Sequence, residues 1–302
     1  MKKLLFSIKD YEYLAEKVLA EGSFEKGELE SGHFTDGERY QRIITPVENR
    51  DVVIIGGTVS DGATLELFDL ASSLVSYGAN SLSLVVPYFG YSTMERAVLP
   101  GEVVTAKTRA RLLSAIPRSN RGNKIYFFDL HSEGIQYYFE QDLYPTHVYC
   151  KDIVIEAAKQ YGGDNFVMAS TDAGRAKWVE SLANDMGVNA AFILKRRLKG
   201  DYTEVSAINA DVAGKTVIIY DDMIRSGGSI INAASTYKDA GATDIFVITT
   251  HGLFVNDGIN KLKNSGLIKK LICTDSHVNS QDIDDDFVEV RSIAGLIGTV
   301  IH

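Results

Sequence analysis

Two adjacent acidic residues followed by a small-residue turn are the part of the sequence best suited to chemistry. Asp221 and Asp222 come directly after the apolar run 217–220, which is typical of a strand buried on both faces. The turn Ser-Gly-Gly-Ser at 226–229 then opens a segment with helical spacing. Such a turn presents unpaired backbone N–H groups at the positive end of a helix dipole, where a phosphate is stabilised. Because carboxylates repel phosphate, we expect the acids to face hydroxyl groups or a divalent cation, and a sugar phosphate satisfies both requirements.

The overall composition is that of a globular protein, with 45% hydrophobic and 24% charged residues. A formal net charge of −9 argues against a dedicated nucleic-acid surface, although the basic cluster 195–197 requires an explanation. No apolar run approaches the roughly 18 residues of a membrane span, and the N-terminal apolar stretch is too short for a signal peptide. Cys150 and Cys273 each stand alone among apolar residues, which favours buried free thiols. A cytoplasmic protein is therefore expected.

Short apolar runs alternate with helical patterns along much of the chain. The runs lie at 52–55, 82–86, 125–128, 166–168, 191–194, 217–220 and 245–249. Helical spacing is clearest at Leu67, Leu70, Ala71 and Leu74 before Gly78, and at Ile230, Ala233, Ala234 and Tyr237 before Gly241. Alternating strands and helices predict an α/β fold with mainly parallel sheets flanked by helices.

Two stretches, beginning at residues 52 and 216, follow the same order of features. Each has an apolar strand, a small-residue turn, a helix, a Gly-Ala pair, a second strand and a turn with Phe and Gly. This repetition predicts a duplication that gives two similar domains, residues 1–148 and residues 149–302. Gly57 and Thr58 stand in the first copy where the second has Asp221 and Asp222. One half is therefore expected to carry a site that the other lacks.

Several further segments point to a known family. They are HFTDGE (33–38), PYFGYSTMER (87–96), DLHSEGIQYYF (129–139), STDAG (170–174), LKRR (194–197) and THGLF (250–254). With the loop at 221–229, they resemble, in the same order, segments of the ribose-phosphate diphosphokinases, also called phosphoribosyl diphosphate synthetases. The resemblance covers nearly the whole chain. It implies two tandem type I phosphoribosyltransferase-like domains, and transfer of the β,γ-diphosphoryl group of ATP to the anomeric hydroxyl of ribose 5-phosphate, with AMP leaving.

The resemblance also implies roles for individual residues. Those implied at ribose 5-phosphate are Asp221, Asp222, Arg225, Ser226, Gly227, Gly228 and Ser229. Those implied at ATP are Phe34, Asp36, Glu38, Arg96 and His131, of which the first three reach a neighbouring subunit in the family. Lys195, Arg197 and His131 are the implied catalytic residues, and Asp172 and His131 the implied Mg²⁺ site. Because a hard cation prefers oxygen ligands, we expect Asp172 to bind it directly and His131 to act at a phosphate or through water.

Simpler interpretations exist for some of these residues. A surface turn would also explain the segment 33–38, and a solvated basic run at a strand end would explain Lys195 and Arg197. The loop at 221–229 could be a capped helix with two solvated acids, but the buried strand before the acids argues against it.

The chain departs from the common family pattern at several positions. Thr93 and Met94 stand where that pattern has Arg and Gln, and Arg225 and Ser226 where it has Asp and Thr. Trp178 lies near a position where a basic residue is usual. The segments TMER, GEVVTA, ARLLSAIP and RSGGS are instead similar to a second class of the family, typified by plant enzymes that are less strict about the diphosphoryl donor. ATP or another nucleoside triphosphate is therefore expected.

Two other functions fit parts of the sequence. A phosphoribosyltransferase needs the loop at 221–229, but that function leaves the duplicated first half without a role. A non-catalytic partner that regulates a true synthetase would explain the changes at residues 93, 94 and 178. The retained cations at 195 and 197 argue against it, because binding alone does not need them. The family resemblance implies a homo-oligomer, with neither nucleic acid nor a membrane as partner.

Overall fold

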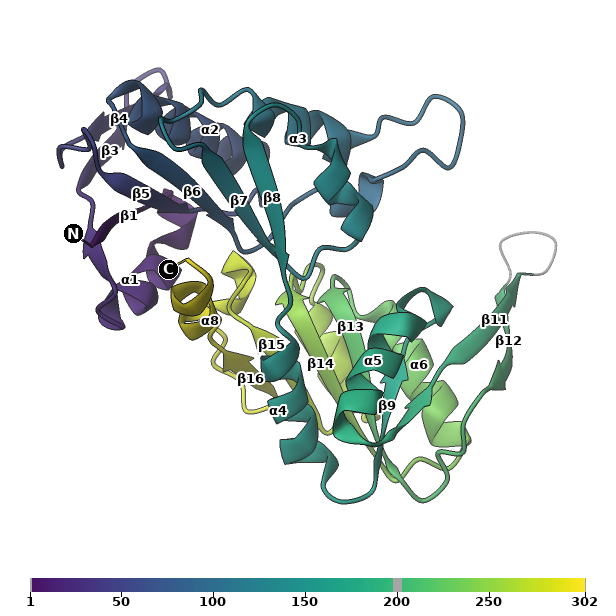
Figure 1. Ribbon diagram of the computed structural model, residues 1–302. Coiled ribbons are helices and arrows are strands. Elements are labelled where there is room, and N and C mark those ends of the chain that lie inside the picture. The colour runs from purple at the N-terminus through teal and green to yellow at the C-terminus, as the bar shows by residue number, and fades with distance from the viewer. Residues whose placement is uncertain (1, 198–202, 302) are drawn as a thin grey trace. The chain divides into compact units, whose positions relative to one another are not determined.

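The computed structural model describes residues 2–197 and 203–301, apart from the side chains of residues 173 and 194–207. The chain forms two compact units (Figure 1), residues 1–149 with 293–302 and residues 150–292. Each unit has its own parallel sheet with helices on both faces. The expected α/β fold class is therefore confirmed.

The sheet of the first unit has the strand order β2-β1-β5-β6-β7-β8, and each neighbouring pair is parallel. Its strands are β1 (Lys3–Ser7), β2 (Phe24–Lys26), β5 (Asp51–Ile55), β6 (Ser81–Val86), β7 (Asn123–Phe128) and β8 (Leu143–Val148). Its helices are η1 (Lys9–Tyr11), α1 (Glu12–Ala20), α2 (Asp61–Ser76), η2 (Ser92–Met94), α3 (Thr105–Ser114), η3 (Glu133–Tyr138) and α8 (Ala294–Val300). A hairpin of β3 (Leu29–His33) and β4 (Arg39–Ile43) lies between β2 and β5 in the chain.

The sheet of the second unit has the order β10-β9-β13-β14-β15-β16 and is also parallel throughout. Its strands are β9 (Phe166–Ser170), β10 (Asn189–Ala191), β13 (Thr216–Ile224), β14 (Asp244–Gly252), β15 (Lys270–Thr274) and β16 (Val288–Arg291). Its helices are α4 (Lys151–Gly162), η4 (Ala173–Arg175), α5 (Ala176–Met186), α6 (Gly228–Asp239), α7 (Gly258–Asn264) and η5 (Val278–Ser280). A separate antiparallel ribbon consists of β11 (Ile193–Arg197) and β12 (Thr203–Ile208).

Each sheet has a point at which connections from two adjacent strands run to opposite edges of the sheet. In the first unit β1 leads through α1 to β2, whereas β5 leads through α2 to β6 on the other side. In the second unit β9 and β13 diverge in the same way. Since crossover connections are right-handed, helices lie on opposite faces on the two sides of such a point. In open α/β sheets, ligands bind at such a point, outside the carboxyl ends of the strands.

In the first unit, the protein's own side chains lie at this point. Tyr11 follows β1, is completely buried, and packs so closely against Gly57 that a Cβ atom there would overlap the tyrosine hydroxyl. Burial raises the pKa of Tyr11 well above its ordinary value. The ring thus lies against Gly57, the position that matches Asp221 of β13 in the second unit.

The helices expected from spacing are confirmed. Leu67, Leu70, Ala71 and Leu74 are buried on α2, and Ile230, Ala233, Ala234 and Tyr237 are buried on α6. Gly78 and Gly241 follow the two helices with φ of +91° and +94°, a backbone conformation that favours glycine.

Two expected strands differ from the structure. The run 191–194 is not one strand, because Ala191 ends β10 and Ile193 begins β11 in a different sheet. Between them, the backbone N–H of Phe192 donates to the Asn209 side chain at 2.5 Å instead of to a sheet neighbour. The run 217–220 continues to Ile224, so Asp221 and Asp222 lie within β13 and not after it.

The C-terminal residues group with the first unit. Residues 293–302, which the sequence analysis counts with the second half, include α8, and the Lys3 ammonium of β1 donates to the Ile301 carbonyl. The domain boundary expected from the duplication, near residue 148, stays a prediction. In the described part of the chain, no helix has the length and apolar character needed to cross a bilayer.

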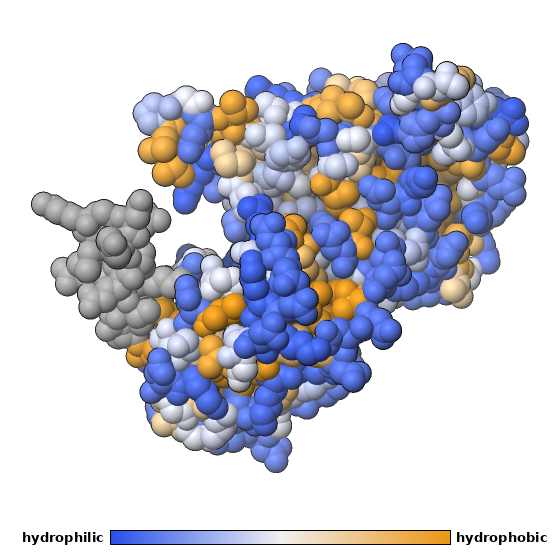
Figure 2. Space-filling view, turned by 180° about the vertical axis from the view of Figure 1, so that it is seen from behind, coloured by the Kyte–Doolittle hydropathy of each residue, from blue (hydrophilic) through white to orange (hydrophobic). Residues whose placement is uncertain are grey.

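The face shown in Figure 2 is mostly hydrophilic, with apolar residues in separate patches. Among the described residues, the largest exposures of apolar side chains are 87% for Tyr137, 75% for Val98 and 68% for Tyr77. Scattered exposed apolar residues of this kind are normal in globular proteins.

Burial in the first sheet makes a test of its core possible. Ile54 of β5 is 0% exposed and Leu65 of α2 is 49% exposed. Ile54→Ala should lower the free energy of unfolding of the first unit by about 2–5 kcal/mol, because it leaves a cavity in a packed core. Leu65→Ala should change it by less than about 1 kcal/mol. Urea titration followed by circular dichroism measures both values, and equal losses would contradict the assigned core.

Candidate active site

The acids of β13 lie where one of its neighbouring strands has ended. Pairing of β13 with β9 stops at Tyr220 and Ser170, whereas pairing with β14 continues to Ile224 and Gly252. From Asp221 onward, one edge of β13 is therefore no longer covered by β9. This is the point of divergence in the second sheet, at the carboxyl ends of its strands (Figure 1).

The two carboxylates point to opposite faces of the sheet because side chains alternate along a strand. Asp221 shares its face with Val217 and Ile219, which pack with residues of α6. Asp222 shares its face with Ile218 and Tyr220, which pack with residues of α4 and α5. Asp221 is thus on the side of the small-residue turn, and Asp222 on the side of the α5 N-terminus.

Each acid has a partner from the segment that follows β9. The Arg175 guanidinium forms an ion pair with Asp222, with Nη2 and Oδ1 2.6 Å apart, and Asp222 is 2% exposed. The Thr171 hydroxyl donates to Asp221 Oδ2 at 3.1 Å, and the backbone N–H of Asp222 lies 3.1 Å from Asp221 Oδ1. Burial, followed by the charge of Asp222, raises the pKa of Asp221 above its ordinary value of 3.8.

The N-terminus of α6 carries no capping side chain. Its N-cap residue is Gly227, with φ +83°, and Gly228 and Ser229 begin the helix in exposed positions. The first intrahelical bond runs from the Ile231 N–H to the Gly227 carbonyl at 3.0 Å, so the preceding N–H groups have no intrahelical acceptor. These N–H groups, together with the helix dipole, would stabilise a phosphate at this end of α6. Arg225 is exposed and Ser226 half-buried just before them.

A tyrosine fixes the strand end that supplies the partners of the acids. The Tyr237 hydroxyl on α6 reaches the carbonyls of Ser170 at 2.9 Å and Ala191 at 3.2 Å. Because Ser170 directly precedes Thr171, these bonds hold the end of β9 against α6. The helix that presents the open N-terminus therefore also positions the segment that contacts both acids.

His251 has a structural environment. It is 2% exposed, lies beside Met223 in the register of β13 and β14, and its Nδ1 is 2.7 Å from the Ser276 hydroxyl. Burial, followed by the charge of His251, lowers the pKa of His277 to about 4. Both histidines are thus buried among polar side chains such as Ser276.

The divalent cation implied by the sequence has one plausible carboxylate ligand in this unit outside the acid pair. Asp172 is half-buried directly after Thr171, and its Oδ1 accepts from the Gly174 N–H at 2.7 Å. Among the described residues, no three His, Cys, Asp or Glu side chains converge on one point. A single carboxylate suits a hard divalent cation that is held by one or two carboxylates together with substrate phosphates.

The nucleotide residues suggested by the sequence lie in the first unit, in two places. Phe34, Asp36 and Glu38 form the exposed turn of the β3–β4 hairpin, where Gly37 has φ +92°. The Phe34 ring packs edge-on against Tyr40, with centroids 5.7 Å apart, and the Asp36 carboxylate accepts from the Glu38 N–H at 3.1 Å. The turn is therefore ordered and exposes an aromatic ring beside two acids.

Arg96 and His131 lie on loops after β6 and β7. The Arg96 side chain is 77% exposed and lies 3.3 Å from the Glu95 carboxylate. The Tyr138 hydroxyl of η3 donates to the Glu95 carbonyl at 2.5 Å, which ties the two loops together. Asp129, two residues before His131, is buried with φ +37°. A left-handed conformation at a non-glycine residue costs roughly 1–3 kcal/mol and is a feature of functional loops.

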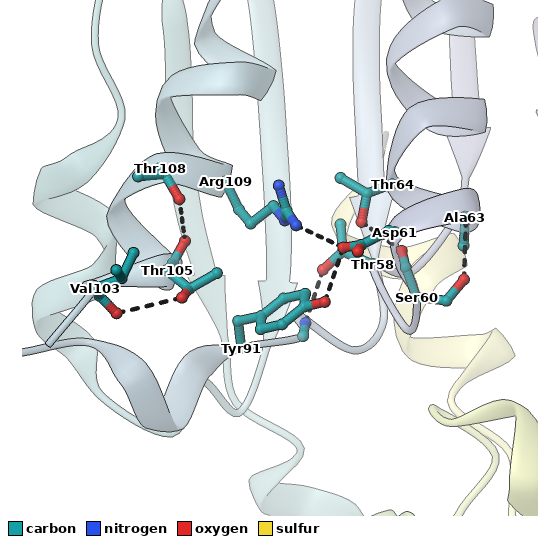
Figure 3. Close-up of polar contacts among 11 residues, drawn as sticks. Thr58, Ser60, Asp61, Ala63, Thr64, Tyr91, Val103, Thr105, Thr108 and Arg109 are labelled. Atoms are coloured by element: carbon teal, nitrogen blue, oxygen red, sulfur yellow. Dashed lines mark hydrogen bonds and ion pairs between the residues drawn. The ribbon is translucent and has the colours of Figure 1, made fainter.

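A polar cluster missed by the sequence analysis holds the loop after β6 (Figure 3). The Tyr91 hydroxyl donates to Asp61 Oδ1 at 2.8 Å, and Arg109 Nη2 lies 2.5 Å from the same oxygen. The Arg109 guanidinium also lies 5.0 Å from the centroid of the Tyr91 ring. The hydrogen bond from Tyr91, assisted by the charge of Arg109, lowers the pKa of Asp61. At α2 the Ser60 hydroxyl caps the helix by accepting from the Ala63 N–H at 3.0 Å, unlike the open end of α6.

The two cations that the family resemblance implies to be catalytic lie partly outside the described residues. Lys195 and Arg197 lie on β11, opposite Val205 and Thr203 of β12, but their side chains are outside the described part of the chain.

Thr171 and Arg175, which hold the acids, were also missed. Thr171 lies within the STDAG segment and Arg175 directly follows it, so this motif was the sequence signal that could have identified them.

Comparison with protein families assigns both halves of the chain to related models. Residues 3–116 match the N-terminal domain of ribose phosphate pyrophosphokinase, and residues 168–295 match the phosphoribosyl synthetase-associated domain.

Curated relatives and a solved structure extend this similarity over the chain. A ribose-phosphate pyrophosphokinase of Fusobacterium nucleatum is 30% identical, over 95% of this chain and 90% of its own. Ribose-phosphate pyrophosphokinase 1 of Lactococcus lactis is also 30% identical, over 98% and 91%. The crystal structure of phosphoribosylpyrophosphate synthetase from Mycobacterium smegmatis is similar with a TM-score of 0.88 and 26% identity, covering 99% of this chain and 98% of that one.

The open helix N-terminus leads to a first test at the site. Gly227→Ala places a Cβ at φ +83° and within 2.8 Å of the Leu262 side chain, so the turn must shift. We expect the Kd for ribose 5-phosphate to rise about tenfold or more, measured by isothermal titration calorimetry. Gly62→Ala in the first turn of α2, where the nearest atom is 3.8 Å away, is the control. An unchanged Kd in Gly227→Ala would remove the turn from the binding site.

The raised pKa of Asp221 leads to a second test. The folded unit keeps this proton at pH values where the unfolded chain has lost it, so the free energy of unfolding falls as pH rises above 3.8. Asp221→Asn removes that dependence. From about pH 5 to about pH 8, the variant should therefore lose less stability than the unsubstituted protein in urea titrations. Asp239→Asn, on the exposed end of α6, is the control; parallel pH curves for Asp221→Asn and the unsubstituted protein would contradict the assignment.

Proposed function

The chain belongs to the ribose-phosphate pyrophosphokinase family, and from this we propose that it transfers the β,γ-diphosphoryl group of ATP to ribose 5-phosphate. The anomeric hydroxyl oxygen forms a bond to the β-phosphorus, the bond from that phosphorus to the oxygen of the α-phosphate breaks, and AMP leaves. The hydroxyl proton is released. The products are phosphoribosyl diphosphate and AMP.

One observation supports this proposal above the others: an acid pair and an uncapped helix N-terminus lie together at the divergence point of the second sheet. Asp221 and Asp222 supply acceptors for sugar hydroxyls, and the turn Ser226–Ser229 supplies N–H donors for the 5-phosphate. The first sheet has the same topology, but Tyr11 packs against Gly57 and Ser60 caps its helix. The family match over both halves and the one-sided site thus agree.

The second unit positions the sugar phosphate. Arg175 offsets the charge of Asp222 and fixes its carboxylate, while Thr171 orients Asp221. With both acceptors held in place, little ordering is required when the ribose hydroxyls bind. Arg225 and Ser226 complete the approach to the 5-phosphate. Positioning of this kind supplies much of the rate in phosphoryl-type transfer.

The first unit supplies nucleotide contacts in this proposal. Arg96 and His131 lie on neighbouring loops joined through Tyr138 and Glu95, and their cationic or polar side chains suit phosphate oxygens. Phe34, with Asp36 and Glu38, offers an exposed ring for a base in a neighbouring subunit. Because Thr93 and Met94 cannot supply the family's Arg and Gln contacts, we propose that donors other than ATP are also accepted.

Family members are kinase-like enzymes that use a divalent metal, and we propose Mg²⁺ at Asp172. Asp172 would hold the ion directly, and the ion would supply positive charge to offset that of the phosphates. His131 would act on a phosphate, because a hard cation prefers oxygen ligands. Lys195 and Arg197 stabilise the transferring group. The proposal also includes a homo-oligomer, which rests on the family resemblance, and a cytoplasmic location, which rests on the sequence analysis.

Product formation tests the proposal directly. The full chain is incubated with ribose 5-phosphate, Mg²⁺ and ATP, with and without inorganic phosphate, and AMP is followed by chromatography. AMP that appears only when the sugar is present supports the diphosphokinase, and its phosphate dependence assigns the class. No AMP from ATP, and no monophosphate from GTP or CTP, would overturn the proposal and favour a regulatory partner.

A single cation provides a sharper test of the transfer step. Lys195→Ala should lower kcat by about 10³-fold, because it removes a positive charge from the transition state. Lys238→Ala on α6 is the control. The Lys238 ammonium donates to the Thr243 carbonyl at 2.7 Å, at the opposite end of α6 from the small-residue turn. Steady-state AMP formation measures both. Full activity in Lys195→Ala would remove the residue from the catalytic set.

A further inference from the structure

We propose that Arg109 is a positioning residue, which holds the loop 91–96 in its nucleotide-binding conformation through Asp61 and Tyr91. The inference rests on the proposed function, because it takes that loop as a nucleotide contact. Arg109 lies on α3, Asp61 at the start of α2, and Tyr91 on the loop itself. Three segments that are distant in sequence are thus joined by one cluster (Figure 3).

The geometry of the cluster makes Asp61 its centre. One carboxylate oxygen, Oδ1, lies 2.5 Å from Arg109 Nη2 and accepts from the Tyr91 hydroxyl at 2.8 Å. The guanidinium lies 5.0 Å from the centroid of the same tyrosine ring. Tyr91 is therefore held at both ends of its side chain, by a hydrogen bond at the hydroxyl and by a cation at the ring face.

Tyr91 needs such support because its backbone is left-handed. Its φ is +61°, an unfavourable conformation for a residue with a large side chain. The residue before it is fixed as well, since the Gly90 N–H donates to the Thr58 hydroxyl at 2.7 Å. After the turn of η2, the Tyr138 hydroxyl holds the Glu95 carbonyl. The contacts of Tyr91 with Asp61 and Arg109 thus set the direction in which the chain leaves β6 and approaches Arg96.

Arg109 is distinguished from its neighbour on the same helix. Its Nε is buried and has no hydrogen-bond partner among the described residues, so Asp61 and the Tyr91 ring determine where the guanidinium lies. Arg111, two residues later, has a half-exposed side chain that pairs with Glu140 at 3.1 Å. Both arginines lie on α3 and each forms an ion pair with an acid, but only Arg109 contacts Asp61 and Tyr91.

The expected result follows from this arrangement. Without Arg109, the loop populates conformations in which Arg96 is misplaced before the nucleotide binds. The apparent affinity for nucleotide then falls in proportion to the fraction of molecules that keep the binding conformation. The site for ribose 5-phosphate lies in the other unit. The KM for ATP should therefore rise about three- to tenfold, while kcat and the KM for ribose 5-phosphate should change less than about twofold.

The experiment compares Arg109→Gln, Tyr91→Phe, the double variant and Arg111→Gln, each as the full chain. Steady-state AMP formation gives kcat and both KM values. Hydrogen exchange of residues 91–104, measured without nucleotide, reports the loop independently of activity. We expect about tenfold faster exchange there in Arg109→Gln, no change in Arg111→Gln, and a double variant that is less impaired than the sum of the single effects.

The outcomes separate this inference from the proposed function. Unchanged exchange in Arg109→Gln, an equal change in Arg111→Gln, or a fall in kcat at constant KM would overturn the positioning role. If the unsubstituted protein forms no AMP, the proposed function fails, while the exchange data still decide whether Arg109 holds the loop.

Discussion

The divergence of β9 from β13 is the constraint on which the site depends. Because β9 ends at Ser170 while β13 continues to Ile224, a strand that is buried on both faces acquires a free edge where Asp221 and Asp222 stand. The segment leaving β9 turns across that edge, and it supplies Thr171 to one acid and Arg175 to the other. Tyr237 couples the same strand end to α6, whose N-terminus is open. One topological feature thus sets the positions of the residues proposed to contact the sugar and the phosphate.

The first unit has the same topological feature, but different side chains stand beside it. Its sheet diverges between β1 and β5, yet the buried Tyr11 ring packs on Gly57, and Ser60 caps the helix that follows. Side chains of the protein thus stand in the first unit where the second unit has the proposed hydroxyl and phosphate contacts. In the proposal, the first unit contributes its loops after β6 and β7, which carry Arg96 and His131.

The fold class and the clearest helices could be predicted from the sequence because they depend on local periodicity. The buried faces of α2 and α6 follow from side-chain spacing. Gly78 and Gly241 mark the ends of the two helices, because glycine favours the backbone conformation found there. The break at Phe192 could not be predicted, since it depends on Asn209, a partner distant in sequence. Arg175 and Thr171 were missed for the same reason: their importance comes from lying beside β13. Arg109 carries no motif signal, and its contacts are tertiary.

The energetics of the acids argue that they are retained for a ligand and not for stability. A buried ion pair such as Arg175 with Asp222 pays a desolvation cost that apolar residues of similar size would avoid. Asp221 adds a second carboxylate next to the first, and burial with this repulsion raises its pKa. Hydroxyl donors from a sugar would relieve that cost, because hydrogen bonds to the charged carboxylate favour it. A polyhydroxyl ligand that donates hydrogen bonds to these carboxylates would thus offset the desolvation and repulsion that destabilise the free site.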